Sequence, residues 1–252
     1  MEESSINNIE VLLILTKVKQ EIRQFIDKIY SEKSTFSSFL KEDKTIVTEV
    51  DLFISDLFKS EFITKYPFLS FYCEEDNNLL KFPAIILDPI DGTKELAQNI
   101  NECAVSFGIY FSPKLDDQRN FSWIYNPFTG FEIHSHQECS KGKRKINDIL
   151  LSFISRTEDE KGNIKSTEDI VYIPKGSIAY KLGLLAAGAC DFVQTKRPKN
   201  IWDIMAGSHI CYQRNIFTYQ NGNKINEFHS SLIENDLIWA SQEVWESPVF
   251  QK

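Results

Sequence analysis

Residues 82–96 read FPAIILDPIDGTKEL, and this segment decides the expected fold and chemistry of the chain. Its first part, FPAIILDPI, is short, apolar and rich in Ile, which predicts a buried strand that ends in a turn. Asp88 lies near the end of that strand, and the chain then turns sharply through Pro89 and Gly92. Residues 93–99 follow the turn and are expected to form a helix.

Two carboxylates in this turn, Asp88 and Asp91, stand three residues apart. Carboxylates at a strand end can converge on one hard cation, and magnesium prefers oxygen ligands while keeping several waters. The carbonyl group of Ile90 lies between them and could add a backbone oxygen. The amide of Gly92 and the first N–H groups of the next helix would form an anion site. The segment is therefore consistent with a meeting place of metal and phosphate, but equally with an ordinary turn and helix cap.

The spacing of the two aspartates argues against one known class of phosphatase. Haloacid-dehalogenase-type phosphatases use a DxDGT motif, in which a nucleophile and an acid are two residues apart. Here the aspartates are three residues apart, so that class is disfavoured.

Three other positions carry carboxylates at expected ends of elements. Glu74 and Glu75 follow the strand-like sequence LSFYC, Asp203 opens the helix-like segment WDIMAG, and Asp51 ends the segment TIVTEVD. Each has an ordinary explanation, because a paired glutamate can lie in a solvated loop and an aspartate at a helix start is often an N-cap. None of them indicates a site by itself.

Taken in order, these segments resemble the signature of the inositol monophosphatase superfamily. The resemblance rests on Asp51, on Glu74-Glu75, on DPIDGT from Asp88, and on the WDxxAG pattern that holds Asp203, and it covers residues 45–209. It implies a magnesium-dependent, lithium-sensitive phosphatase with an α+β fold, a layered α/β/α/β/α sandwich. The whole chain, 1–252, would be one phosphatase domain made of two closely packed α+β halves that meet near residue 145.

The same resemblance implies a role for each site residue. Two or three magnesium ions would be held by Glu74, Asp88, Asp91, Asp203 and the Ile90 carbonyl. Asp51 would support a metal through water, and Thr93 together with Glu74 would orient and help deprotonate the attacking water. The physics agrees, since clustered carboxylates cannot all stay ionised in a cleft without cations between them.

The substrate is less constrained than the reaction. Lys94-Glu95 and Lys181 resemble the CysQ-like branch, the 3′(2′),5′-bisphosphate nucleotidases, which implies adenosine 3′,5′-bisphosphate as the substrate and a metal-activated water as the nucleophile. A lysine near the second phosphate makes sense because the metals can serve only one phosphate. The substrate-binding residues are expected to be Gly92, Thr93, Lys94, Ser177 and Lys181.

Other substrates and roles stay open at this point. The spacing from Gly176-Ser177 to Lys181 matches the inositol-type enzymes, so an inositol-1-monophosphatase or a sugar (bis)phosphatase is an alternative. Lys196 and Arg197 lie near, but not on, the place of the usual nucleotidase arginine. A non-catalytic binding or regulatory homologue is the alternative of another class, and the complete carboxylate set argues against it.

Composition limits the partners. With 42% hydrophobic residues the chain can build a core, and a net charge of −8 gives no electrostatic footprint for nucleic acid. The five scattered Cys residues indicate reduced thiols, and the only early apolar run, 11–15, is too short for a membrane span, so a cytoplasmic location is expected. We expect a small phosphorylated metabolite as partner, with no nucleic acid polymer and no membrane.

Three weaker features remain. His134 and His136 alternate on a predicted strand, and without a third ligand a surface strand is the better explanation. The aromatic tail with Trp239, Trp245 and Phe250 is either a homodimer interface, as in many family members, or the edge of a core. The basic segment KGKRK, residues 141–145, is expected to be a solvated turn.

Overall fold

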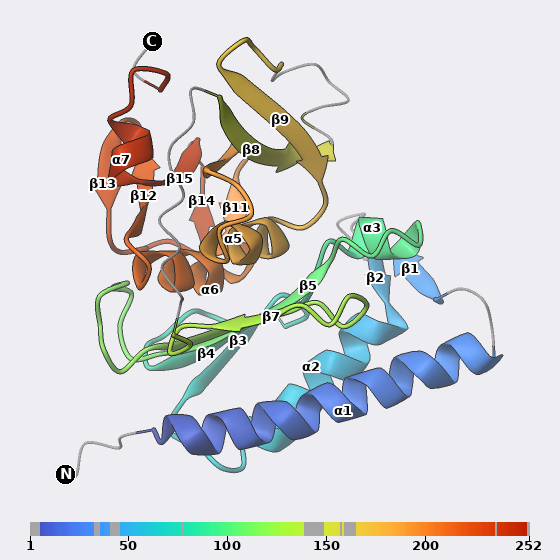
Figure 1. The fold of residues 1–252 in the computed structure, drawn as a ribbon. Helices are drawn as coiled ribbons and strands as arrows, with labels where there is room; N and C mark the ends of the chain where they lie inside the picture. The colour runs from blue at the N-terminus through green and yellow to red at the C-terminus, as the bar shows by residue number, and fades with distance from the viewer. Residues whose placement is uncertain are drawn as a thin grey trace.

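Two large β-sheets, of five and six strands, alternate with three layers of helices in this protein (Figure 1). The computed structural model describes residues 6–32, 36–40, 46–76, 78–138, 149–156, 158, 165–234 and 236–250. The helices are α1 (Asn8–Glu32), α2 (Glu49–Phe62), α3 (Thr93–Ala97), α5 (Ile178–Ala186), α6 (Ile201–Tyr212) and α7 (Gln242–Trp245). The strands are β1 (Ser38–Leu40), β2 (Ile46–Thr48), β3 (Ser70–Cys73), β4 (Ala84–Asp91), β5 (Ala104–Tyr110), β6 (Phe121–Tyr125), β7 (Glu132–His134), β8 (Leu150–Ser155), β9 (Ile170–Lys175), β10 (Phe192–Thr195), β11 (Lys199–Asn200), β12 (Ile216–Gln220), β13 (Asn223–Ile225), β14 (Leu232–Ile233) and β15 (Leu237–Ser241).

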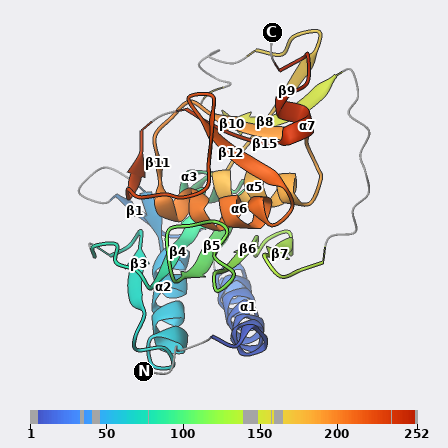
Figure 2. The ribbon, with the colours of Figure 1, turned by 90° about the vertical axis from the view of Figure 1, so that its left-hand side faces the viewer.

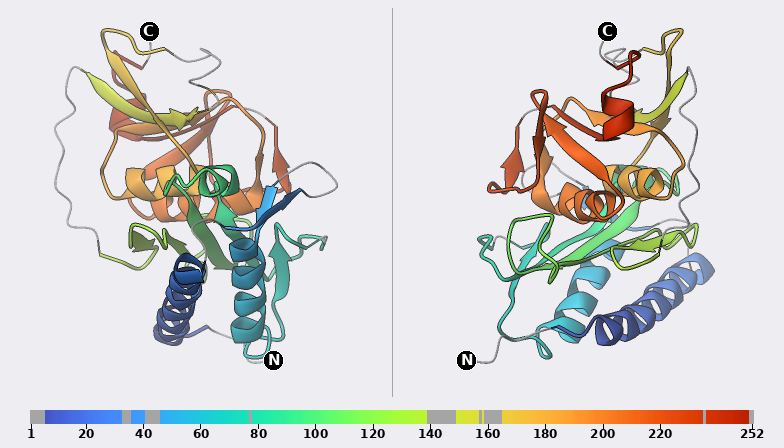
Figure 3. Two further views of the ribbon diagram at one scale, coloured as in Figure 1. Left: turned by 90° about the vertical axis from the view of Figure 1, so that its right-hand side faces the viewer. Right: turned by 60° about the vertical axis from the view of Figure 1, so that its left-hand side comes forward.

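The layers follow the predicted order α/β/α/β/α. Helices α1 and α2 cover one face of a five-stranded sheet with the order β3-β4-β5-β6-β7. Helices α5 and α6 fill the space between that sheet and a six-stranded sheet with the order β13-β12-β15-β10-β8-β9 (Figures 1 and 2). The short helix α7 lies on the outer side of the second sheet, far from α1 (Figure 3). The α+β sandwich expected from the sequence is confirmed.

Strand β4 is apolar on both faces because both faces are buried. Ile85 and Leu87 belong to the core under α1 and α2, whereas Ala84 and Ile86 belong to the core that contains α5 and α6. A strand buried on both sides has no solvent face and therefore carries a continuous apolar run instead of an alternating one. The continuous apolar run at residues 84–88 therefore predicts a strand in the middle of the fold.

Helix α1 is amphipathic, and one stripe of its surface is buried. Its buried residues are Val11, Leu15, Val18, Ile22, Ile26 and Ile29. Ile9 and Leu13, although apolar, are 71% and 67% exposed. The stripe keeps a regular spacing of three or four residues along the whole helix, and the two exposed residues are rotated away from it.

Two helix starts differ from the expectation. The N-cap of α2 is Thr48, and Asp51 is the third helical residue, where it completes a capping box with Thr48. Helix α6 repeats the pattern, with Asn200 as N-cap and Asp203 as the third residue. Just before α2, strand β1 pairs antiparallel with β2.

The aromatic tail packs within this chain. Trp239 is fully buried, the ring of Trp245 stacks on Tyr219 at 4.0 Å between centroids, and Phe250 contacts Phe192 edge to face. Trp245 and Phe250 form the edge of a core on the outer face of the second sheet, whereas Trp239 belongs to the core that contains α5 and α6. None of the described helices is both long enough and apolar enough to span a membrane.

Candidate active site

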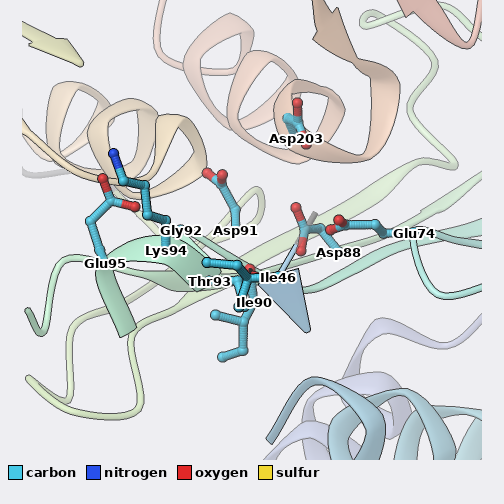
Figure 4. Close-up of a pocket in the computed structure, with 10 residues that line it drawn as sticks. All are labelled: Ile46, Glu74, Asp88, Ile90, Asp91, Gly92, Thr93, Lys94, Glu95 and Asp203. Carbon is cyan, nitrogen blue, oxygen red and sulfur yellow. Dashed lines mark hydrogen bonds between the residues drawn. The ribbon is translucent and has the colours of Figure 1, made fainter. Parts of the chain in front are cut away.

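The loop at the end of β4 brings Asp88 and Asp91 onto the same side of the sheet. In a regular strand, residues three apart point to opposite faces. Here Asp88 pairs with Ser106 and Asp91 pairs with Ala104, so three steps on β4 match two steps on β5. Such a bulge re-aims a side chain, and the two carboxylates face one pocket (Figure 4).

Helix α6 supplies the third carboxylate. One oxygen each of Asp88, Asp91 and Asp203 lies within 4.8 Å of the others. The capping box fixes Asp203, whose Oδ2 accepts a hydrogen bond from the Asn200 amide at 3.1 Å. Ser106, the cross-strand partner of Asp88, donates from Oγ to the Trp202 carbonyl at 2.7 Å. Strand and helix are therefore tied together where their carboxylates meet.

Glu74 and the turn after Asp91 complete the pocket, a cavity of about 410 Å³. Glu74 follows β3 and lies beside Asp88 (Figure 4). Gly92 has a left-handed conformation, with φ of +94°, which glycine adopts without steric cost and which lets the chain enter α3. Helix α3 ends at Ala97, shorter than the predicted 93–99. The cavity is lined by Ile46, Glu74, Asp88, Ile90, Asp91, Gly92, Thr93, Lys94, Glu95 and Asp203.

The charges in this pocket fit a divalent cation. Burial raises the pKa of Asp88 well above its usual value, and the carboxylates of Glu74, Asp91 and Asp203 raise it further. The pKa of Asp203 is also raised, by burial and by Asp91. The Oδ1 atom of Asp88 is buried without a hydrogen-bond partner among the described residues. A buried carboxylate oxygen that lacks a donor and lies among other carboxylates is typical of a site for a hard cation.

Thr93 connects this pocket to Asp51. The Thr93 hydroxyl donates to Asp51 Oδ1 at 3.0 Å and lies 2.8 Å from the Ile90 carbonyl oxygen. The other oxygen of Asp51 accepts from the Thr48 amide at 2.9 Å and from the Thr48 hydroxyl. Burial raises the pKa of Asp51 to about 6, against hydrogen bonds from the two threonines that lower it. At neutral pH Asp51 is thus an ionised acceptor that fixes the Thr93 hydroxyl.

Asp91 is held from the second half of the chain. One of its oxygens accepts from the Ser177 hydroxyl and from the Ala179 amide, both at 2.6 Å. Ser177 is the N-cap of α5 and accepts from the Tyr180 amide at 2.9 Å. The Asp91 carboxylate on β4 therefore anchors the start of α5 beside the pocket.

A second cavity of about 160 Å³ adjoins the first and has the opposite charge. The two share Asp91, Gly92, Lys94 and Glu95 as a common wall. The other residues that line it are Ser155, Lys175, Gly176, Ser177, Ile178, Lys181, Thr195, Arg197 and Lys199. Five cationic side chains therefore surround this second cavity, next to a pocket of carboxylates.

Lys181 is the most unusual of these cations. It is 2% exposed, and its ammonium group donates to the Lys175 carbonyl at 3.3 Å. Burial and the neighbouring Lys199 lower its pKa to about 8. The carboxylates of Asp91, Glu158 and Glu95 oppose this shift in part, but in the part of the chain that the structure describes none of them forms an ion pair with Lys181. A buried ammonium with little compensation is costly unless an anion joins it.

The predicted site residues fall into these two cavities. Glu74, Asp88, Ile90, Asp91, Gly92, Thr93, Lys94 and Asp203 line the first, Ser177 and Lys181 line the second, and Asp51 lies behind Thr93. Lys175, Arg197 and Lys199 also line the second cavity, although they are not among the predicted site residues. The signal for them was weak, namely basic residues at the ends of β9 and of the segment before α6.

The weaker sequence features lie elsewhere. His134 and His136 both stack on Phe121, and the Asn8 amide contacts His136 at 3.0 Å, so they join α1 to the sheet. Among the described residues, no third metal-binding side chain is grouped with them. The basic segment 141–145 lies outside the described residues.

The sequence matches one protein family and resembles curated members of it. The sequence profile of the inositol monophosphatase family matches residues 7–245. The curated 3′(2′),5′-bisphosphate nucleotidase CysQ of Buchnera aphidicola is 26% identical over 227 residues, which is 82% of this chain and 83% of that protein.

Solved structures share the fold. The Thermotoga maritima IMPase superimposes with a TM-score of 0.73 at 19% identity, covering 95% of both chains. The crystal structure of an IMPase/NADP phosphatase complexed with Mg²⁺ and phosphate superimposes with a TM-score of 0.70 at 18% identity, covering 95% of this chain and 92% of that one. At this level of identity the structures show a common fold.

Proposed function

The chain belongs to the inositol monophosphatase family of magnesium-dependent phosphoric monoester hydrolases, and we propose that it is a 3′(2′),5′-bisphosphate nucleotidase acting on adenosine 3′,5′-bisphosphate. The observation that carries the proposal is the cation-lined cavity beside the carboxylate pocket. A substrate with two phosphates can place one in each cavity. The likeness to a CysQ nucleotidase supports the same substrate class.

We propose that two or three magnesium ions are held by Glu74, Asp88, Asp91, Asp203 and the Ile90 carbonyl. The buried, unpaired Oδ1 of Asp88 supports this assignment, as does the shared fold with a phosphatase complexed with Mg²⁺ and phosphate. When bound, the ions would supply positive charge that stabilises the phosphoryl oxygens and favours deprotonation of a water.

The chain itself positions the nucleophile. With its proton directed to Asp51, the Thr93 hydroxyl presents a lone pair that can accept a hydrogen bond from an attacking water. Glu74 lies on the opposite side of Asp88 from Thr93 and can accept the second proton of that water (Figure 4). Both interactions favour loss of a proton as the phosphorus is attacked, which is general-base assistance.

The substrate is expected to be oriented by both cavities. We propose that the backbone at Gly92 and Thr93 faces the scissile phosphate, since the first N–H groups of a helix lack partners within it. Lys94 lines both cavities, and Ser177 and Lys181, which line the second, would face the second phosphate. An anion beside Lys181 would recover the cost of burying its charge.

Several finer points remain predictions. They are the single domain with two halves that meet near residue 145, the cytoplasmic location, lithium inhibition and a homodimer. An inositol-1-monophosphatase or a sugar (bis)phosphatase with the same metal site is the alternative substrate assignment, and a non-catalytic homologue is the alternative of another class.

The test is release of phosphate, with magnesium, from adenosine 3′,5′-bisphosphate and from inositol 1-phosphate in parallel. Asp91→Asn serves as the blank, because it removes a carboxylate of the first cavity. Strong preference for the nucleotide is the expected result. Preference for the inositol ester would instead mean that the second cavity does not select a phosphate, and release from neither substrate would contradict the proposal.

A further inference from the structure

We propose that Glu102 is a positioning residue that couples the two cavities, by anchoring the turn 175–177 whose other end orients Asp91. Glu102 lies two residues before the start of β5 and lines neither cavity. The inference goes beyond the proposed substrate, since it concerns how the metal-binding carboxylate is held in place.

Glu102 is the acceptor for three groups at once. Its Oε2 atom accepts from the Gly176 amide at 2.8 Å and from Arg156 at 2.7 and 3.1 Å. Its Oε1 atom accepts from the Lys175 ammonium at 3.2 Å. Two side chains and one backbone group of the second half are thus fixed to one carboxylate of the first half.

The turn at Gly176 packs closely against Glu102. A Cβ atom at Gly176 would lie 2.4 Å from the Glu102 carbonyl oxygen and 2.7 Å from Cγ of Glu95, so only glycine fits. The next residue, Ser177, has φ of +31°, a conformation that a residue with a side chain keeps only when its surroundings impose it. Glu102 holds the residue just before that strained position.

The strained residue is the one that contacts Asp91. The Ser177 hydroxyl and the Ala179 amide both donate to the same oxygen of Asp91, and the Asp91 carboxylate also lies in the group formed with Asp88 and Asp203. Glu102 and Asp91 therefore hold one short segment of chain from two sides. If the Glu102 contacts are lost, the turn can relax, and Asp91 loses the donors that aim it.

Glu102 also sets the charge of the second cavity. Lys175 lines that cavity and is ion-paired to Glu102, whereas Arg156 is drawn to Glu102 outside its lining. Releasing both cations would add free positive charge near the place proposed for the second phosphate. The same carboxylate thus acts on the orientation of Asp91 and on the field of the cation cavity.

The test compares Glu102→Ala and Glu102→Gln by the dissociation constant of Mg²⁺, measured by titration calorimetry. Loss of a residue that orients a metal ligand commonly costs about 10- to 100-fold in metal affinity, so we expect at least about tenfold weaker binding in Glu102→Ala. Glu102→Gln keeps a carbonyl oxygen for the Gly176 amide and should stay within about threefold of the wild type. Asp117→Asn, which removes a carboxylate paired to Arg119 away from both cavities, is the matched control.

A second variant keeps the test decisive if Glu102→Ala fails to fold. Gly176→Ala leaves Glu102 intact but pushes the turn away, and it should weaken Mg²⁺ binding in the same direction. A purely structural role would lower the melting temperature of these variants and leave the Mg²⁺ dissociation constant unchanged, and that result would overturn the proposal. The titration needs no nucleotide, so it decides this question even if the substrate assignment fails.

Discussion

The two cavities differ in the sign of their charge and in how the chain builds them. The first is made of carboxylates at the ends of β3 and β4 and at the start of α6, each fixed by backbone pairing or a capping box. The second is made of lysines and one arginine around the start of α5, and it shares Asp91 and Lys94 with the first. Each cavity is electrostatically unfavourable when empty, and each would be relieved by a ligand of the opposite charge.

Under the proposed function, the two cavities have separate tasks. Chemistry needs the carboxylates, because phosphoryl transfer depends on charge neutralisation and positioning at the reacting phosphate. Selection among substrates depends on the cations, because they stabilise only a bound substrate that carries a second anionic group. Changes in the first cavity should therefore lower activity on every monoester, whereas changes in the second should act on selectivity.

The largest expected effect is at Asp88. Asp88→Asn should lower kcat/KM by about 1,000-fold or more, since losing a metal-binding carboxylate removes several kcal/mol of transition-state stabilisation. The loss should be similar for adenosine 3′,5′-bisphosphate and inositol 1-phosphate, as measured by phosphate release. A loss confined to one substrate would break the division of tasks.

Thr93 should give the next effect. Thr93→Ala removes the hydroxyl that Asp51 orients and should lower kcat by about 100-fold with little change in KM, the range of general-base assistance. Thr93→Ser keeps the hydroxyl and should retain most of the activity in the same steady-state assay. Equal losses in both variants would show that packing of the methyl group matters, and not the hydrogen bond.

The pH dependence should separate the cavities. The pKa of Lys181 is lowered to about 8, so the residue is charged below that pH and loses its charge as the pH rises through it. KM for the bisphosphate should therefore rise about tenfold between pH 7 and pH 9, as the competent fraction falls. KM for inositol 1-phosphate, measured over the same range, should change much less.

The same shift has a consequence for stability with its own sign. Because the folded-state pKa of Lys181 lies below the usual value near 10.5, the unfolded chain binds more protons between pH 8 and 10.5. The free energy of unfolding should gain about 1.4 kcal/mol per pH unit from this residue across that window. Lys181→Met should remove that contribution in urea titrations at several pH values.

The smallest expected effect concerns the metal-free carboxylate cavity. Burial and neighbouring carboxylates raise the folded-state pKa of Asp88, so its contribution to stability is complete below pH 4 and is lost as the pH rises through the raised value. Without metal, Asp88→Asn should therefore melt above the wild type at neutral pH, by about 3 °C per kcal/mol of repulsion removed. Mg²⁺ should stabilise the wild type and reverse that order in thermal scans, and no response to Mg²⁺ would count against a metal site.

The carboxylate cavity could be predicted from sequence because its residues sit in local patterns. The apolar run before Asp88 predicts a strand, and the turn residues after it predict its end. The bulge that brings Asp88 and Asp91 to one face could not be predicted, since it arises from pairing with β5. Nor could the cap residues Thr48 and Asn200 be distinguished from the aspartates three positions later.

Most residues of the cation cavity could not be predicted from the sequence. Lys175, Arg197 and Lys199 come from different segments, and only the packing of β9, α5 and the chain before α6 brings them together. Lys181 was noticed through a family resemblance, but its burial was not foreseen, because a lysine on a helix is usually solvated. The role inferred for Glu102 depends on contacts to residues 54 to 74 positions away, which no local pattern records.

The central claim is that a cation cavity selects the second phosphate, and Lys181→Met tests it most directly. The measurement is the ratio of kcat/KM for adenosine 3′,5′-bisphosphate to that for inositol 1-phosphate, with the surface variant Lys17→Met as control. A hydrogen bond to a charged group contributes about 1.5 to 3 kcal/mol, so the ratio should be high in the wild type and control and fall about 10- to 100-fold in Lys181→Met. A ratio unchanged by Lys181→Met, or a wild type that prefers the inositol ester, would contradict the claim.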